Sequence, residues 1–139
     1  MTGILPDLPA LEAAYAALGP VQRMNRANRT THAAAFCDLT GAIQVVREDI
    51  GRHNALDKLA GALARTNMDA AGGFILLSSR VSVEMVQKAA AVGAPALAAV
   101  SAPSALALRM AGSAGMALYA WSSAGVMYFP AERPAEDAR

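Results

Sequence analysis

The chain has 139 residues, the length of one domain, and a domain of this size buries enough surface to fold without a metal or a disulfide. Its net charge is +1, with no basic run, which excludes a patch for duplex nucleic acid and a stacking platform for single strands. No apolar run reaches a membrane span, the first residues lack a signal-peptide pattern, and the single cysteine, Cys37, indicates a reducing compartment. We therefore expect a cytoplasmic protein with no nucleic-acid and no membrane partner.

The first half of the chain is predicted to form a helix followed by a hairpin. Leu8–Leu18 carries an apolar stripe at helical spacing, and Gly19-Pro20 is expected to end the helix. The stripe consists of Leu8, Leu11, Tyr15 and Leu18. Val21–Arg29 is polar and basic, and is either a second short helix or a connector. The strands Thr31–Cys37 and Ala42–Glu48 are joined by a hairpin-type turn.

The second half alternates helices with strands. Asn54–Ala64 is a clear helix, and its apolar stripe consists of Leu56, Leu59, Ala60 and Leu63. The elements that follow are the turn Ala71–Gly73, the strand Phe74–Leu77, the helix Val81–Val92, the strand Ala94–Val100, the helix Ser104–Ser113, and the strands Met116–Trp121 and Val126–Phe129 around Ser122–Gly125. Repeated strand–helix–strand units call for right-handed crossovers and a parallel sheet between helices.

These elements predict an α/β fold, a three-layer α/β/α sandwich with a mixed sheet. We expect one domain over residues 1–139, in which residues 1–29 are a helical lead-in, residues 30–129 are the α/β core, and residues 130–139 are a frayed charged tail. The sequence shows no internal repeat.

Three polar clusters stand where a strand gives way to a helix: Gly51–Asn54, Ser78–Arg80 and Ser101–Ser104. Ligands of open α/β sheets sit beyond the carboxyl ends of the strands, where helix N-termini offer free N–H groups to an anion. Arg80 can add a forked phosphate contact. The clusters predict a phosphate or nucleotide site, although Ser, Asn and Gly also begin helices as ordinary caps.

Other polar residues have simpler interpretations. Glu84 and Lys88 are four residues apart and fit a surface ion pair, while Asp57 and Lys58 fit a solvated helix face. Cys37 lies late in an apolar strand, where a buried small hydrophobe is the alternative to a reactive thiol.

The two histidines, His32 and His53, have no partner cysteines at zinc-ligand spacing. We therefore expect no protein-bound metal. The P-loop pattern and the dinucleotide fingerprint are both absent from the chain.

Four segments resemble the FdhD/NarQ family, the formate dehydrogenase accessory sulfur carriers. The most specific is Glu48–Lys58, which resembles the signature E-D-x-G-R-H-N-A-x-D-K. The others are Thr31–Ala34, similar to the end of T-G-x-H-A-A, Ser78–Glu84 with Gln87-Lys88, similar to S-G-R-x-S-x-E…K, and Val100–Ser104, similar to V-S-A-P-[ST]. The similarity extends from about Leu8 to Phe129.

The resemblance implies a cytidine-deaminase-like α/β/α fold without the zinc ligands. It implies a homodimer that takes sulfur from a cysteine desulfurase and passes it to the cofactor destined for the formate dehydrogenase apoenzyme. The implied ligand is Mo-bis(molybdopterin guanine dinucleotide) or a GDP-like molecule. The candidate contacts are His32, Arg52, His53, Asp57, Ser78, Arg80, Glu84, Lys88, Ser101, Ser104, Trp121, Ser122, Ser123, Ala124, Gly125 and Val126.

The chain departs from the family pattern in three places. The family's persulfide cysteines lie in an upstream C-x-x-C motif that this sequence does not contain, so the chain is either a shortened member or a fragment. Trp121-Ser122-Ser123 stands where the family has an F-x-R segment, and Ser79 replaces a glycine. The catalytic residue is therefore unknown, with Cys37 as a candidate.

Three functions follow from these observations. The first is an accessory protein that binds the molybdenum cofactor and assists its sulfuration. The second is a shortened binding or assembly module that moves no sulfur, as the missing C-x-x-C suggests. The third is a nucleoside deaminase, which has the fold in its favour and the missing metal ligands against it.

Overall fold

The computed structural model describes residues 4–22, 31–122 and 125–131 of the chain. Its elements are, in chain order, α1 (Leu8–Val21), β1 (His32–Asp38), β2 (Ile43–Asp49), α3 (Arg52–Arg65), the 3-10 helix η1 (Ala70–Gly72), β3 (Gly73–Leu77), α4 (Val83–Ala91), β4 (Ala96–Ala99), α5 (Ala105–Ser113), β5 (Ala117–Ser122) and β6 (Gly125–Phe129). None of these helices is both long enough and apolar enough to cross a bilayer.

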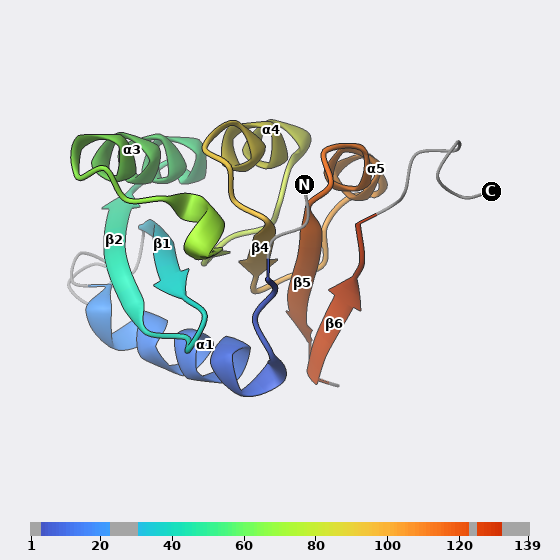
Figure 1. The fold of residues 1–139 in the computed structure, drawn as a ribbon, viewed down its shortest axis with the longest axis horizontal. Helices are drawn as coiled ribbons and strands as arrows, with labels where there is room; N and C mark the ends of the chain where they lie inside the picture. The colour runs from blue at the N-terminus through green and yellow to red at the C-terminus, as the bar shows by residue number, and fades with distance from the viewer. Residues whose placement is uncertain (1–3, 23–30, 123–124, 132–139) are drawn as a thin grey trace.

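One sheet lies between two helical layers (Figure 1). Its strand order is β2-β1-β3-β4-β5-β6. The inner strands β3, β4 and β5 run parallel, while β1 and β2 at one side and β6 at the other pair antiparallel. Helices α3, α4 and α5 cover one face and α1 covers the other. The predicted three-layer sandwich with a mixed sheet is therefore confirmed.

The wholly apolar strand β3 supplies side chains to both cores. Ile75 and Leu77 belong to the cluster under α3, α4 and α5, while Phe74 and Leu76 belong to the cluster under α1. Successive side chains of a strand point to opposite faces, so a strand buried on both sides has no polar position. Each of these four residues is at most 1% exposed.

Helix α1 packs differently from the predicted stripe. Its buried residues are Ala10, Leu11, Ala14 and Leu18, whereas Leu8 and Tyr15 are 52% and 44% exposed. The helix also continues through Pro20 to Val21, so the predicted stop at Gly19-Pro20 was wrong. Val21 packs against the apolar cluster under α1, and this tertiary contact stabilises the last turn of the helix. The proline in that turn lacks only one backbone N–H donor.

Several helix and strand boundaries also differ from the predictions. Helix α3 begins two residues earlier than expected, which places Arg52 and His53 in its first turn. Helix α4 begins after Ser82, whose hydroxyl oxygen accepts from the Met85 N–H. Strand β4 begins two residues later than predicted, directly after Pro95, and it ends one residue earlier, at Ala99. Of the segment predicted as a short helix or connector, only Val21 and Gln22 lie within the described residues.

Strand β1 is held tightly at the end of the β1–β2 hairpin. The Asp38 carboxylate accepts from the Thr40 hydroxyl at 2.5 Å and from the Thr40 and Ala42 N–H groups at 2.9 and 3.1 Å. The Thr40 hydroxyl, with the backbone N–H groups, holds the pKa of Asp38 below its usual value. On the other side of β1, Gly73 lies so close to the Cys37 carbonyl that a β-carbon would collide with it.

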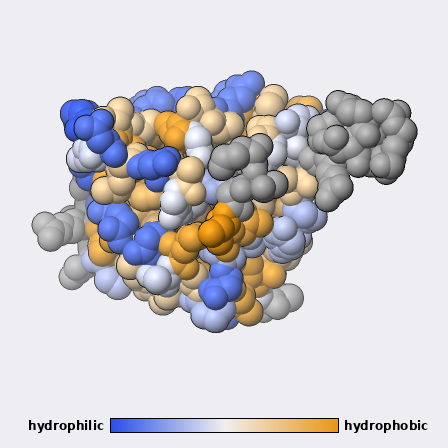
Figure 2. All heavy atoms as spheres, viewed as in Figure 1, coloured by the Kyte–Doolittle hydropathy of each residue, from blue (hydrophilic) through white to orange (hydrophobic). Residues whose placement is uncertain are grey.

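The hydrophilic residues lie mainly on the outside of these layers. Figure 2 shows them over α3 and along β2, while hydrophobic residues gather near the middle of the same face. The exposed large hydrophobic residues are Ile4, Leu5, Leu8, Tyr15, Ile50, Leu106, Met127 and Tyr128.

Candidate functional site

A pocket opens where three helices begin, and we call it the arginine pocket. Its volume is about 280 Å³, and it is lined by Arg52, Arg80, Val81, Ser82, Val83, Glu84 and Ser104. Arg52 opens α3, Arg80 lies between β3 and α4, and Ser104 precedes α5. Each of the three predicted polar clusters therefore supplies one residue to this pocket.

The arginine pocket combines two guanidinium groups with one carboxylate. The pKa of Glu84 is lowered by a hydrogen bond from its own backbone N–H, then by the Ser82 hydroxyl and by the charges of His53 and Arg52. Glu84 is therefore ionised at neutral pH, and it offsets part of the positive charge of Arg52 and Arg80. The balance still favours an anion, because the N-termini of α4 and α5 add partial positive charge.

The serines of the arginine pocket cap helices. The Ser104 hydroxyl oxygen accepts from the Ala107 N–H at 3.1 Å, and the Ser82 oxygen accepts from the Met85 N–H at 3.4 Å. The alternative interpretation as caps therefore holds for Ser104. It does not exclude a ligand contact, because a hydroxyl that accepts from a helix still has its hydrogen to donate.

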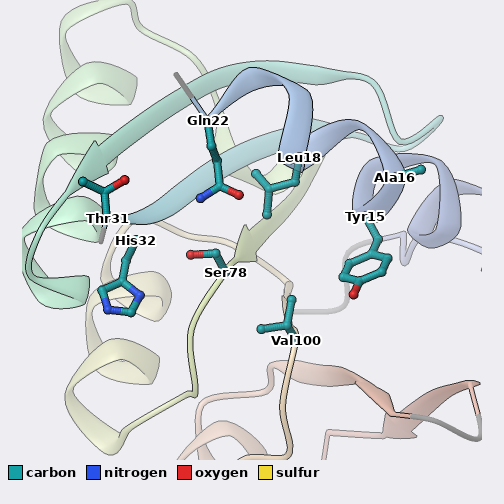
Figure 3. Close-up of a pocket in the computed structure, with 9 residues that line it drawn as sticks. Tyr15, Ala16, Leu18, Gln22, Thr31, His32, Ser78 and Val100 are labelled. Atoms are coloured by element: carbon teal, nitrogen blue, oxygen red, sulfur yellow. The ribbon is translucent and has the colours of Figure 1, made fainter. Parts of the chain in front are cut away.

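A second and larger pocket lies between α1 and the ends of β1, β3 and β4, and we call it the α1 pocket (Figure 3). Its volume is about 590 Å³, and it is lined by Tyr15, Ala16, Leu18, Gly19, Gln22, Thr31, His32, Ser78 and Val100. Two predicted contacts, His32 and Ser78, belong here and not to the arginine pocket. The Ser78 hydroxyl oxygen accepts from the Ala33 N–H at 2.8 Å, and the Ser78 N–H donates to the Ala33 carbonyl at 3.0 Å.

Of the predicted contacts on the last hairpin, Trp121 lies against a residue of the α1 pocket, three others lie within the hairpin, and two lie outside the described residues. Trp121 stacks on Tyr15 with ring centroids 4.6 Å apart and an angle of 18° between the rings, so it supports one wall of that pocket. The Ser122 hydroxyl donates to the Gly125 carbonyl at 3.0 Å, and Val126 pairs with Trp121 across the hairpin. Ser123 and Ala124 lie outside the described residues.

Asp57 and Lys88 pair with each other on neighbouring helices. The Lys88 Nζ lies 2.8 Å from the Asp57 Oδ1, so the interpretation that pairs Glu84 with Lys88 on one helix is wrong. Likewise, Lys58 is not simply solvated, because its Nζ lies 2.8 Å from the Asp49 Oδ2. Asp57 and Lys88 are each the sixth residue of their helix, and neither lines the arginine pocket or the α1 pocket.

Two further predicted contacts lie near strand and helix ends without lining either pocket. His53 is the second residue of α3 and is half-buried. Ser101 follows β4 and is also half-buried. Their ligand roles stay predictions.

Cys37 is fully buried in the apolar cluster under α1. Burial raises the pKa of its thiol to about 12, and the charge of Asp38 adds to the effect. Because the thiolate is the nucleophilic form, this environment makes the thiol unreactive at neutral pH. Within the described ranges, no three His, Cys, Asp or Glu side chains gather in a way that could hold a metal ion.

Sequence reasoning predicted only His32 and Ser78 among the residues of the α1 pocket, and it missed the other polar or aromatic ones, Tyr15, Gln22 and Thr31. Gln22 and Thr31 are only 7% and 6% exposed. No local signal marks them, because Gln22 is buried only once α1 packs across the strand ends. The Thr31 hydroxyl donates to a Glu48 Oε1 at 3.0 Å, a contact that also depends on the pairing of β1 with β2.

Known proteins resemble this chain in sequence and in fold. Residues 4–132 match the model of the FdhD/NarQ family. The chain is 53% identical over 112 residues to a sulfur carrier protein FdhD of Xanthomonas euvesicatoria, covering 81% of this chain and 40% of that protein. It is 58% identical over 97 residues to a sulfur carrier protein FdhD of Bordetella petrii, and this match covers 70% of this chain and 35% of that protein.

A solved structure has a similar fold. It is the crystal structure of a protein from Desulfotalea psychrophila, provisionally described as a formate dehydrogenase accessory protein. The TM-score is 0.84 at 24% identity, and the match covers 94% of this chain and 56% of that one. The chain thus spans well under two thirds of the length of the relatives it matches.

Proposed function

Since the chain belongs to the FdhD/NarQ family, we propose that it is the cofactor-binding part of a formate dehydrogenase accessory protein. Its cargo in this proposal is Mo-bis(molybdopterin guanine dinucleotide), which it holds while sulfur is added. The observation that carries the proposal is the arginine pocket, where Arg52 and Arg80 lie beside the starts of three helices. The implied partners are a cysteine desulfurase and the formate dehydrogenase apoenzyme, and the homodimer also stays a prediction.

The chemistry of the arginine pocket suits a phosphate group. Arg52 and Arg80 can each present a planar fork to phosphate oxygens, which a point charge such as lysine cannot do. Backbone N–H groups at the starts of α4 and α5 add donors, and the Ser104 hydroxyl has its hydrogen free to donate. With a volume of about 280 Å³, the pocket fits the phosphate-bearing part of the cofactor rather than the whole of it.

A calorimetric titration of the purified chain with GDP tests this proposal. We expect saturable binding that Arg80→Ala weakens by about 1.5–3 kcal/mol, or roughly 10- to 150-fold, the scale of a hydrogen bond to a charged group. Arg109→Ala is the matched control, because Arg109 is exposed on α5 and lines neither pocket. Unchanged affinity in Arg80→Ala removes the arginine pocket from the site, and no binding at millimolar GDP contradicts the proposal.

Cys37 favours the second candidate function, a cofactor-binding module that moves no sulfur itself. It is the only cysteine in the sequence, and it is buried with a raised pKa. In this version, the sulfur is carried by a cysteine other than Cys37. Incubation with a cysteine desulfurase and cysteine, followed by mass spectrometry, separates the two candidates: a persulfide on Cys37 that moves on to an acceptor would reject the module that moves no sulfur.

A further inference from the structure

The turn between β2 and α3 positions Arg52. Asp49 is the last residue of β2, and Arg52 is the first residue of α3, which follows the strand directly (Figure 1). Only Ile50 and Gly51 lie between them. Arg52 lines the arginine pocket beside Glu84. The conformation of this short turn therefore sets the place from which the Arg52 side chain reaches the pocket.

The Asp49 carboxylate holds this turn from the strand side. Its Oδ1 accepts from the Gly51 N–H at 3.0 Å, the contact that defines an Asx turn. Gly51 is the N-cap residue of α3, and the helix begins with no side-chain cap hydrogen bond. The Gly51 carbonyl accepts the first backbone bond of the helix, from the Ala55 N–H at 2.9 Å. Asp49 therefore holds the residue that directly precedes Arg52.

Lys58 holds the same turn from the second turn of α3. Its Nζ lies 2.8 Å from the Asp49 Oδ2, and it donates to the Glu48 carbonyl at 3.0 Å. The hydrogen bond from Lys58, followed by that from the Gly51 N–H, holds the pKa of Asp49 below its usual value, so the carboxylate is ionised at neutral pH. We call these contacts of Lys58 and Asp49 the lysine clamp. The lysine clamp ties the start of α3 to the end of β2.

The lysine clamp fixes a place that apolar packing does not fix. The body of α3 is held on the sheet by buried residues such as Leu56 and Leu59, each at most 1% exposed. In the turn itself, Ile50 is 72% exposed. The side chains of Lys58 and Asp49 are 50% and 23% exposed, and ion pairs with this much access to water add little to stability. The clamp should therefore affect the orientation of the turn more than the stability of the fold.

We propose that Lys58 and Asp49 are positioning residues for the anionic ligand, holding the β2–α3 turn so that Arg52 stays in the arginine pocket. Neither of the two lines that pocket, so both act through Arg52. A guanidinium makes two parallel hydrogen bonds to a phosphate only while its plane stays aligned with the phosphate oxygens. Supporting contacts that hold such a group in place are part of a working site. The inference rests on the proposed function, since it assigns two more residues to the same phosphate site.

Calorimetric titration of Lys58 variants with GDP tests this inference. Lys58→Met keeps most of the side chain and removes its charge, and we expect it to weaken GDP binding about three- to tenfold, less than the loss of a whole arginine contact. Lys58→Arg keeps a cation that can reach both oxygens and should recover most of the affinity. Arg65→Met is the matched control, because it removes a cation from the last residue of the same helix, outside both pockets. It should bind like the wild type.

Two measurements distinguish a positioning role from a merely structural one. The urea midpoint of Lys58→Met should stay close to that of the wild type, because the ion pair is exposed. In a double-mutant cycle, Lys58→Met should cause little further loss of affinity once Arg52→Ala is present, because Lys58 acts through Arg52. A further loss by the same factor as in the wild type would mean that Lys58 acts on the ligand by another route, and the inference would be overturned.

The same titrations separate this inference from the proposed function. The inference is overturned if Lys58→Met binds GDP like the wild type, and the proposed function stands if Arg80→Ala still loses that binding. A wild-type chain that does not bind GDP contradicts both. Should Lys58→Met fail to fold, Asp49→Asn is the second variant, because its Oδ1 can still accept from the Gly51 N–H while the charge facing Lys58 is removed. It should weaken GDP binding too, and wild-type affinity in Asp49→Asn would then overturn the inference.

Discussion

Alkylation of the native chain offers a direct test of whether Cys37 can act as a sulfur carrier. Iodoacetamide reacts with thiolates, and this chain has a single cysteine, so one mass-spectrometric adduct reports on one site. The thiol is completely buried under α1, and any reaction with a sulfur donor meets the same obstacle as the alkylating reagent. We expect Cys37 to stay unmodified in the native protein on the time scale that modifies the unfolded chain.

The expected difference in rate follows from the pKa. Burial raises the pKa of Cys37 from 9.0 to about 12. At pH 8, a shift of this size lowers the thiolate fraction by a factor of about 10³. Lack of access to the sulfur adds to that factor. Native alkylation at pH 8 should therefore be at least about a thousandfold slower than alkylation in urea.

The residual native reaction should depend on how α1 is held. Leu11 packs in the same apolar cluster as Cys37, whereas Leu59 packs in the cluster on the other face of the sheet. Leu11→Ala should accelerate alkylation more than Leu59→Ala does, if lifting α1 exposes the sulfur. A native rate within tenfold of the rate in urea, or a native rate that rises with a midpoint near pH 9, would refute the reasoning.

Three further predictions concern stability. Gly73→Ala should lower the free energy of unfolding in urea by about 1–3 kcal/mol, because the added β-carbon would collide with the Cys37 carbonyl of β1. Gly72→Ala is the control, because a β-carbon there has no other atom within 4 Å, and it should change the free energy of unfolding by less than about 0.5 kcal/mol. A double-mutant cycle on Asp57 and Lys88 should give a coupling of about 0.2–1 kcal/mol that falls with added salt, and zero coupling at low salt would contradict the pair. The lowered pKa of Asp38 means that its carboxylate stabilises the fold above its ordinary pKa of 3.8 and that this contribution is lost as the pH falls through the lowered value. Asp38→Asn should therefore lower the urea midpoint at pH 7, with a difference from wild type that shrinks in acid; a difference independent of pH would count against this.

Most of the elements and the layer order were predictable from local patterns. The apolar run of β3 predicted a strand with packed side chains on both faces of the sheet, and β3 does supply residues to both apolar clusters. The strand–helix–strand spacing predicted parallel pairing, and β3, β4 and β5 do pair in parallel. The meeting of Arg52, Arg80 and Ser104 was also predictable, because the topology brings strand ends and helix starts to one edge.

The errors arose where contacts between distant segments outweighed a local rule. Helix α1 continues through Pro20, because Val21 packs on the sheet. Lys88 pairs with Asp57, which lies 31 residues away, rather than with Glu84 four residues away. In both cases, the contact with the neighbouring element stabilises the observed arrangement at least as much as the local preference stabilises the predicted one.

The sequence by itself determined the fold class, the family resemblance and the residues that open the helices, because periodicity and motif spacing are properties of neighbouring positions. Only the tertiary structure decided that these candidates divide between two pockets, one that contains Arg52 and Arg80 and one that contains His32 and Ser78. It was also needed to find Tyr15 and Gln22, because the ring of Trp121 and the ends of the strands reach them only after α1 has packed across the sheet. The reason is physical: a pocket is formed by side chains of separate elements, and no local pattern encodes which of them will meet.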